Sequence, residues 1–244
     1  LIETWEDIKR AVNCIPSTPL PSQPEFIVTN DLTATSTITI SGGITLKALD
    51  RADAVTITRG ADFTGAFFDN NSTLILEGIT LDGGSTGETS IQAEAPLITS
   101  NDSLTLNNCT LQNNKNTSTT PGGAINISGG TFTMNGGVIG SEVTENDPLK
   151  TYSWEYAADA NNYSNYAEAG GGGIYVASGD VTIDNATISY NYTPNPDENL
   201  DGENKKNLKI SHGGGISVVK GNLTINNAEV SYNSGYQGAG IRCY

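Results

Sequence analysis

Apolar and polar residues alternate in short bursts along most of this chain. In Val181-Thr-Ile183 and Leu223-Thr-Ile225 an apolar residue stands on either side of a threonine, and Leu104-Thr-Leu106 repeats the pattern. The bursts end at glycine or asparagine. A period of two over so few residues predicts short β-strands with one buried face.

These bursts belong to a sequence repeat. The stretch Gly171–Asn191 recurs 42 residues later as Gly213–Asn233, with 13 of 21 positions identical, and Gly122–Ile139 is a third copy. Alignment of the copies and of the preceding sequence produces columns of apolar residues. The main columns are Phe67, Leu97, Ile125, Ile174, Ile216 and Ile241; Leu74, Leu104, Phe132, Val181 and Leu223; Leu76, Leu106, Met134, Ile183 and Ile225; and Leu81, Leu111, Ile139, Ile188 and Val230.

The repeat dictates the fold class. Three bursts in each unit, with no helical pattern between them, exclude a layer of alternating strands and helices. They fit a chain in which each strand pairs in parallel with its equivalent one turn along. We therefore predict an all-β fold, a right-handed parallel β-helix (solenoid), because crossover connections are right-handed. Each column is then an inward stack, so Asp in place of Ile183 or Ile225 is expected to unfold its neighbourhood.

The two ends of the sequence differ from the repeat. Thr4–Val12 predicts a short amphipathic helix with Thr4 as N-cap, which we expect to cover the N-terminal end of the β-helix. Residues 1–24 are thus predicted to form a capping helix and a proline-rich connector, and residues 25–244 the β-helix domain. Gly238–Ile241 starts another copy of the repeat, so we expect the natural chain to continue and this domain to be truncated at its C-terminal end.

Composition and charge argue against several classes of binding partner. The chain has 244 residues and a formal net charge of −15, which argues against nucleic acid and anionic membranes as partners. No apolar run approaches the roughly 20 residues that span a bilayer, so we expect no membrane insertion within this segment. Three cysteines give no disulfide framework. Cys109 falls in a column of small residues and is expected in the core.

Two long insertions, residues 141–169 and 192–212, interrupt the repeat at equivalent places, and long loops on a regular scaffold are common binding sites. The first insertion carries a set of aromatic residues among acids and amides. Two interpretations stay open: the rings bind a glycan or a host or matrix protein, or they fold back onto the strands. The aromatic residues concerned are Tyr152, Trp154, Tyr156, Tyr163 and Tyr166.

The second insertion contains half of a calcium-loop pattern. Asp197, Asn199 and Asp201 occupy positions 1, 3 and 5, and Gly202 occupies position 6. Position 12 is Leu208 in place of the usual glutamate. The stretch is therefore either a Ca²⁺ site or a solvated acidic loop, and the sequence indicates no other cofactor.

An asparagine column, Asn114, Asn191 and Asn233, is predicted to form a hydrogen-bonded amide ladder. The single histidine, His212, lies beside a glycine run without an obvious partner, which favours a structural role. Neither feature indicates catalysis.

The repeated GG-[AG]-I motif followed by I-S-Y-N or V-S-Y-N resembles the GGAI and FxxN repeats of the chlamydial polymorphic outer-membrane proteins, although Ile188 and Val230 replace the aromatic residue of FxxN. The opening TWEDIKRAV, with DLTATSTITISGGITLKA and GITLDGG, is similar to pectate-lyase-like adhesive domains of large bacterial surface proteins. This resemblance implies a secreted or cell-surface bacterial protein that acts as a non-catalytic adhesion or stalk module.

The alternative is a polysaccharide lyase or glycoside hydrolase, because pectin-active enzymes share the predicted fold. Such enzymes need carboxylates gathered on an outward strand face. The outward column holds Thr105, Thr133, Thr182 and Thr224 instead, so we expect no enzyme. Ice binding by threonines is a third interpretation, but Val138 and Glu229 interrupt the second threonine column.

Overall fold

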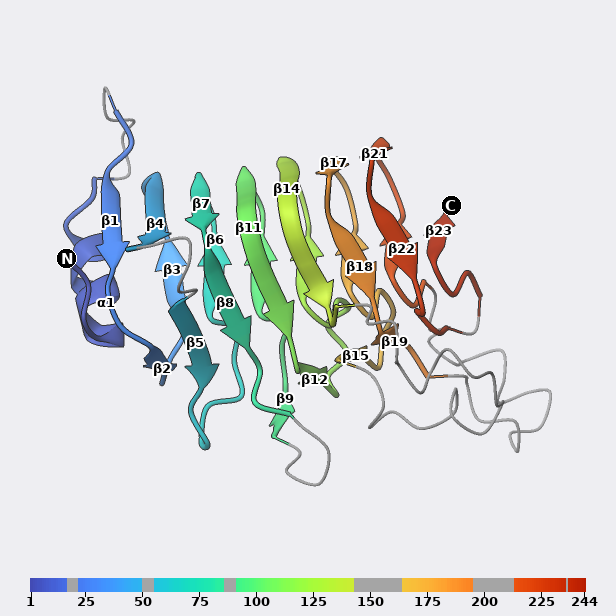
Figure 1. The fold of residues 1–244 in the computed structure, drawn as a ribbon, viewed down its shortest axis with the longest axis horizontal. Helices are drawn as coiled ribbons and strands as arrows, with labels where there is room; N and C mark the ends of the chain where they lie inside the picture. Colours follow the sequence, from blue (N-terminus) through green and yellow to red (C-terminus); the bar gives the residue numbers. More distant parts are fainter. Residues whose placement is uncertain (17–21, 50–54, 86–90, 143–163, 195–212, 236) are drawn as a thin grey trace.

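The computed structural model describes residues 1–16, 22–49, 55–85, 91–142, 164–194, 213–235 and 237–244. Within these ranges the chain is mostly β, with parallel strands in three curled sheets and one short helix at the N-terminal end. Successive strands stand side by side along the long axis of the molecule (Figure 1). The prediction of an all-β parallel fold with a short N-terminal helix is confirmed at this level.

The first sheet has 12 strands, arranged in two neighbouring lines. One line comprises β1 (Glu25–Val28), β4 (Ile44–Ala48), β7 (Leu74–Glu77), β11 (Leu104–Gln112), β14 (Thr131–Gly140), β17 (Asp180–Asp184) and β21 (Leu223–Asn226). The other comprises β2 (Leu32–Ala34), β5 (Val55–Arg59), β8 (Ile79–Asp82), the second halves of β11 and β14, β18 (Thr187–Ser189) and β22 (Glu229–Ser231).

Two further sheets complete the fold. A seven-stranded sheet contains β3 (Ile38–Ile40), β6 (Phe68–Asn70), β10 (Ile98–Ser100), β13 (Ile125–Ile127), β16 (Ile174–Val176), β20 (Ile216–Val218) and β23 (Ile241–Cys243). A four-stranded sheet contains β9 (Gln92–Ala93), β12 (Lys115–Asn116), β15 (Asn165–Ala167) and β19 (Asn191–Tyr192).

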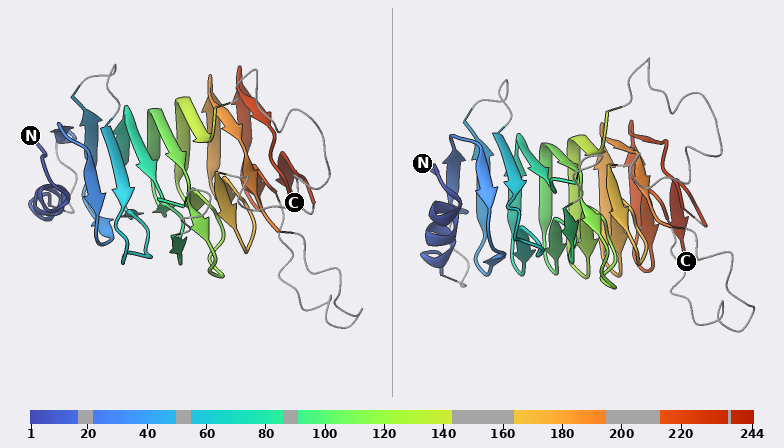
Figure 2. Two further views of the ribbon diagram at one scale, coloured as in Figure 1. Left: turned by 60° about the horizontal axis from the view of Figure 1, so that its bottom comes forward. Right: turned by 90° about the horizontal axis from the view of Figure 1, so that it is seen from below.

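The chain visits the sheets in a fixed order. It passes through the two lines of the 12-stranded sheet, then, from β9 to β19, through the four-stranded sheet, and last through the seven-stranded sheet. We call one such passage a repeat unit; the first is β1–β3 and the last described is β21–β23. The further views in Figure 2 show the units following one another from α1 at one end to β23 near the other.

The register confirms most of the predicted columns. Leu104 pairs with Leu74 and Phe132, and Ile183 with Met134 and Ile225, as the repeat alignment requires. The first column was wrong by one residue at its start, because Ile125 pairs with Ile98, and Ile98 in turn with Phe68.

The error in that column has a simple cause. Phe67-Phe68 and Leu97-Ile98 are apolar pairs, and all four side chains are fully buried. An alternation pattern cannot decide which member of such a pair lies in the strand. Only the hydrogen-bonded register distinguishes them.

The repeated glycines are required by the close approach of adjacent units. A Cβ atom on Gly123 would lie 1.8 Å from the carbonyl oxygen of Gly172, and one on Gly172 would lie 2.4 Å from that of Gly214. No side chain fits into such contacts. The GG motif before β13, β16 and β20 is therefore a packing requirement of the fold.

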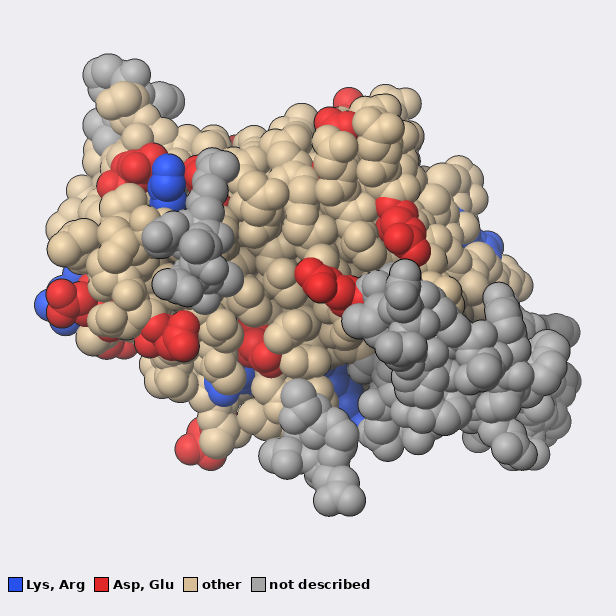
Figure 3. Space-filling model, in the orientation of Figure 1, with Lys and Arg blue, Asp and Glu red and all other residues tan. Residues whose placement is uncertain are grey.

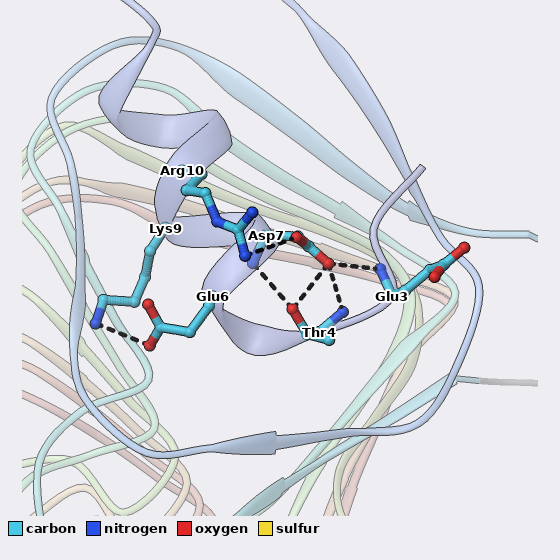
Figure 4. A network of polar contacts seen from close by, with 6 residues as sticks. All are labelled: Glu3, Thr4, Glu6, Asp7, Lys9 and Arg10. Carbon is cyan, nitrogen blue, oxygen red and sulfur yellow. Dashed lines mark hydrogen bonds and ion pairs between the residues drawn. The ribbon is translucent and has the colours of Figure 1, made fainter.

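Helix α1 (Trp5–Asn13) begins with a capping box. The Thr4 side chain accepts a hydrogen bond from the Asp7 backbone N–H at 3.2 Å, and the Asp7 carboxylate accepts one from the Thr4 backbone N–H at 2.9 Å (Figure 4). The Thr4 hydroxyl also donates to the Asp7 carboxylate at 2.8 Å, and this bond, together with those from the backbone N–H groups of Glu3 and Thr4, lowers the pKa of Asp7. Lys9–Glu6 and Arg10–Asp7 ion pairs lie on the exposed side of the helix.

The apolar face of α1 covers the N-terminal end of the sheets. Trp5, Ile8 and Val12 are buried in the common core. The Trp5 ring lies 5.6 Å from that of Phe68, and its indole N–H donates to the Ser36 carbonyl at 3.0 Å. The helix thus closes the core at this end, the role that the sequence predicted for it.

Candidate functional site

Two tyrosines lie side by side on the outer face of the four-stranded sheet. Tyr166 on β15 and Tyr192 on β19 are in register, with ring centroids 5.6 Å apart and planes tilted by 43°. Both rings are half-buried, while Asn165 and Asn191, which precede them, are fully buried. Alternation along these short strands therefore directs the rings outward and the amides inward.

The amides hold this part of the sheet in place. Nδ2 of Asn165 donates to Oδ1 of Asn191 at 2.9 Å, and Nδ2 of Asn191 donates to Oδ1 of Asn233 at 2.9 Å. The backbone N–H of Asn114 donates to Oδ1 of Asn165 at 3.3 Å. The predicted asparagine ladder is present, and it has Asn165 as an additional member. A buried ladder of this kind fixes the position of the tyrosines on the opposite side of the strands.

Charged groups flank the tyrosine pair. The Tyr166 hydroxyl donates a hydrogen bond to the Glu168 carboxylate. Burial raises the pKa of Tyr166, and the bond to Glu168 raises it further, because this bond is made by the neutral phenol. Lys115 on β12 is the register neighbour of Tyr166 on the other side. The outer face thus combines two rings, a carboxylate and an ammonium group.

A second tyrosine pair lies on the adjacent turn. The rings of Tyr190 and Tyr232 stack at 5.2 Å with an interplanar angle of 6°. Each residue precedes a ladder asparagine and has a left-handed backbone, with φ of 55° and 50°. The same turn geometry in consecutive units places the two rings parallel.

Of the five predicted aromatic site residues, the described part of the chain contains only Tyr166. Tyr152, Trp154, Tyr156 and Tyr163 lie outside the described residues. The interval predicted as a loop, 141–169, is not a loop throughout, because Asn165–Ala167 forms β15. The insertion returns to the sheet before the glycine run.

Tyr192 was not predicted as a partner of Tyr166, because the two residues lie in different insertions of the sequence. The dipeptides Asn165-Tyr166 and Asn191-Tyr192 carry the signal. An aromatic residue directly after a ladder asparagine must point to the outer face. Two such dipeptides in consecutive units predict neighbouring rings.

The proposed calcium ligands, Asp197, Asn199 and Asp201, lie outside the described residues, and the Ca²⁺ site stays a prediction. Over the ranges that the structure describes, no group of three His, Cys, Asp or Glu side chains is placed to hold a metal ion. Among the described residues, no helix is long and apolar enough to cross a membrane.

The visible surface of the sheets is largely uncharged. Acidic side chains are spread over it in small groups, and basic side chains appear at only a few places (Figure 3). Comparisons with known proteins add no assignment: no family model matches the chain, and neither curated proteins nor solved structures give a significant match.

Proposed function

We propose that the curled parallel sheets form a right-handed parallel β-helix. Every unit adds strands to the 12-stranded and seven-stranded sheets in the same order, with one parallel register maintained from β4 to β21. The repeat pattern and the handedness of parallel crossovers support this assignment.

The protein acts, in this proposal, as a non-catalytic adhesion or stalk module of a bacterial cell-surface or secreted protein. The observation that carries the binding role is the outward pair Tyr166 and Tyr192, held by the buried asparagine ladder. The resemblance of the GG-Ile repeats to those of bacterial surface proteins supports the location.

The chemistry of the pair indicates the class of ligand. Tilted tyrosine rings offer apolar faces together with hydroxyl groups, which suits a glycan or an aromatic or proline side chain of a host or matrix protein. Glu168 and Lys115 add a hydrogen-bond acceptor and a donor beside the rings. The net charge of −15 disfavours strongly anionic ligands.

The test is a binding screen of the intact chain on glycan and matrix-protein arrays. Each ligand is assayed with calcium and with a chelator, and each mixture is examined for new reducing ends or unsaturated products. Specific retention without product, lost on Tyr166→Ala and on Tyr192→Ala, is the expected result. Loss of retention on chelation would assign part of the site to residues 197–201.

Tyr175→Ala is the matched control, because Tyr175 lies on β16 in a different sheet and is likewise half-buried. Retention that Tyr175→Ala lowers as much as Tyr166→Ala would contradict a site on the four-stranded sheet. Product formation would favour the alternative, a pectin-active lyase or hydrolase.

A further inference from the structure

The outer face of the four-stranded sheet carries two exposed carboxylates close to the tyrosine pair. Glu94, Thr117 and Glu168 each come directly after a strand of this sheet, β9, β12 and β15 respectively. Backbone hydrogen bonds extend the pairing to these positions: the N–H of Thr117 donates to the Ala93 carbonyl, and that of Glu168 to the Asn116 carbonyl, both at 3.0 Å. Both glutamates are exposed. The row therefore places two negative charges beside the strands.

Glu168 lies at the edge of the Tyr166 ring. The two residues are two positions apart, so alternation directs both to the outer face, and the Tyr166 hydroxyl donates to the Glu168 carboxylate. Because a phenol hydroxyl lies in the plane of its ring, this bond leaves the carboxylate at the ring edge and the ring faces turned elsewhere. The faces carry partial negative charge. Two tilted rings and a carboxylate thus bring negative charge together at one place.

Lys115 lies on the other side of Tyr166. It is in register with Tyr166 on β12, whereas Tyr192 is in register with Tyr166 on β19. Neighbouring strands are about 4.8 Å apart, so the backbone of Lys115 is about 10 Å from that of Tyr192. Its ammonium group repels a cation that approaches over β12. A bound cation is therefore favoured on the side of the pair that Tyr192 forms.

We propose that Tyr166, Tyr192 and Glu168 bind an arginine side chain of a protein partner. This inference rests on the proposed function and names the ligand class of the same site. The guanidinium group stacks on the tyrosine faces and donates hydrogen bonds to the Glu168 carboxylate. An ionised carboxylate has about four lone-pair positions, so the bond from Tyr166 leaves it able to accept others.

Arginine fits this site better than lysine or a neutral sugar. Its guanidinium group is planar, stacks on aromatic rings and presents a fork of donors to a carboxylate, and it is more weakly hydrated than an ammonium group. A neutral sugar also stacks on tyrosine but gains nothing from the negative charge of Glu168. The carboxylate is therefore the group that selects the ligand.

The charge of the whole chain favours the same kind of partner. The formal net charge is −15, and the visible face shows acidic groups at more places than basic ones (Figure 3). Such a surface attracts a basic partner over a distance and speeds its association, but it does not by itself select a site. The experiment must therefore separate the local contribution of Glu168 from that of the net charge.

The experiment titrates the intact chain into a fluorescently labelled heptapeptide in which three arginines alternate with glycine, and binding is followed by fluorescence anisotropy. Saturable binding is expected. The same peptide with citrulline in place of arginine keeps the shape of the side chains but not their charge, and it is expected to bind at least about tenfold more weakly. A lysine peptide is expected to bind about threefold more weakly than the arginine peptide.

Variants of the chain locate the contact. Glu168→Gln is expected to weaken binding of the arginine peptide about tenfold, and Lys115→Gln to strengthen it about threefold, because one removes an attraction and the other a repulsion. Glu229→Gln is the matched control. Glu229 is exposed on β22 in another sheet, its carboxylate accepts a hydrogen bond from the Ser231 hydroxyl at 2.6 Å, and its replacement removes the same charge from the chain. Its binding is expected to stay within about twofold of wild type.

Three results would overturn the inference. They are the absence of saturable binding, equal binding of the arginine and citrulline peptides, and equal weakening by Glu168→Gln and Glu229→Gln, which would reduce the effect to net charge. Failure here is distinguishable from failure of the proposed function. If the arrays show retention that Tyr166→Ala and Tyr192→Ala abolish while the arginine peptide does not bind, the site stands and its arginine ligand is wrong. If neither is retained, both proposals fail.

Discussion

The guanidinium group of Arg59 donates from Nη2 to the side-chain oxygen of Asn114 at 2.9 Å, although the two residues belong to different repeat units with another unit between them. Gly83 and Gly84 stand in that intervening unit. A Cβ atom on Gly83 would lie 2.6 Å from Cα of Asn114. Glycine at position 83 allows this close approach of Asn114, and Arg59 is the first donor of the asparagine ladder.

Arg59 is 2% exposed and has no carboxylate partner among the described residues. Its Nη1 donates to the carbonyls of Phe63 and Gly65, and the rings of Phe63 and Phe67 lie 5.2 and 4.9 Å from the guanidinium carbon. Burial lowers the pKa of Arg59 to about 10, and the group stays protonated at neutral pH. Carbonyl dipoles and aromatic faces replace the water that it loses.

Replacing Arg59 by Met is therefore expected to destabilise the fold by about 2–4 kcal/mol, because the Asn114 oxygen and two carbonyls lose their donors inside the protein. Urea unfolding followed by circular dichroism measures the change. Arg10→Met is the control, since Arg10 lies on the exposed side of α1 and its ion pair is worth little. Equal stabilities of the two variants would show that the buried contact contributes nothing.

Sequence periodicity predicted the parts of the fold that repeat. The columns through Val181, Ile183 and Ile188 emerged directly, because each unit buries an apolar residue at the same place. Arg59 and Asn165 could not be assigned in the same way. Arg59 takes part in the ladder without being an amide, and a long insertion separates Asn165 from the preceding ladder residue.

The candidate site was predicted only in part. Tyr166 was identified because the insertion that contains it is rich in aromatic residues. Its pairing with Tyr192, however, depends on the return of the chain to the four-stranded sheet as β15. A two- or three-residue strand has too short a pattern to be recognised by alternation. The ladder asparagine before each tyrosine is the stronger signal.

The two aligned isoleucines, Ile183 and Ile225, are expected to differ in importance. Asp at either position was predicted to unfold its neighbourhood, yet Ile183 is fully buried and Ile225, on β21, is half-buried. Ile183→Ala should cost about 3 kcal/mol in the free energy of unfolding, and Ile225→Ala about 1 kcal/mol. Parallel urea titrations test the ranking. Equal losses would contradict the difference in burial between the two side chains.

The three thiols are expected to differ in their rate of reaction with a thiol reagent. All are free; Cys14 and Cys243 are exposed, and burial raises the pKa of the Cys109 thiol to about 11. Because the thiolate is the reactive form, an aromatic disulfide reagent near neutral pH is expected to modify two thiols quickly and the third only on unfolding. Cys109→Ala should remove the slow phase alone. Three fast thiols in the folded protein would contradict the burial of Cys109.

Tyr166 is expected to ionise later than an ordinary tyrosine, whose pKa is about 10. Its pKa is raised in the folded protein, so its contribution to stability is complete below about pH 10 and is lost as the pH rises through the higher, folded-state pKa. Between about pH 8 and about pH 11, wild type should lose stability relative to Tyr166→Phe in urea titrations, and tyrosinate absorbance should show one late ionisation that the variant lacks. Glu168→Gln removes the carboxylate that accepts the hydrogen bond, so the ionisation should shift to lower pH while burial still keeps it above the ordinary value. Superimposable wild-type and Tyr166→Phe titrations would contradict the placement of this hydroxyl.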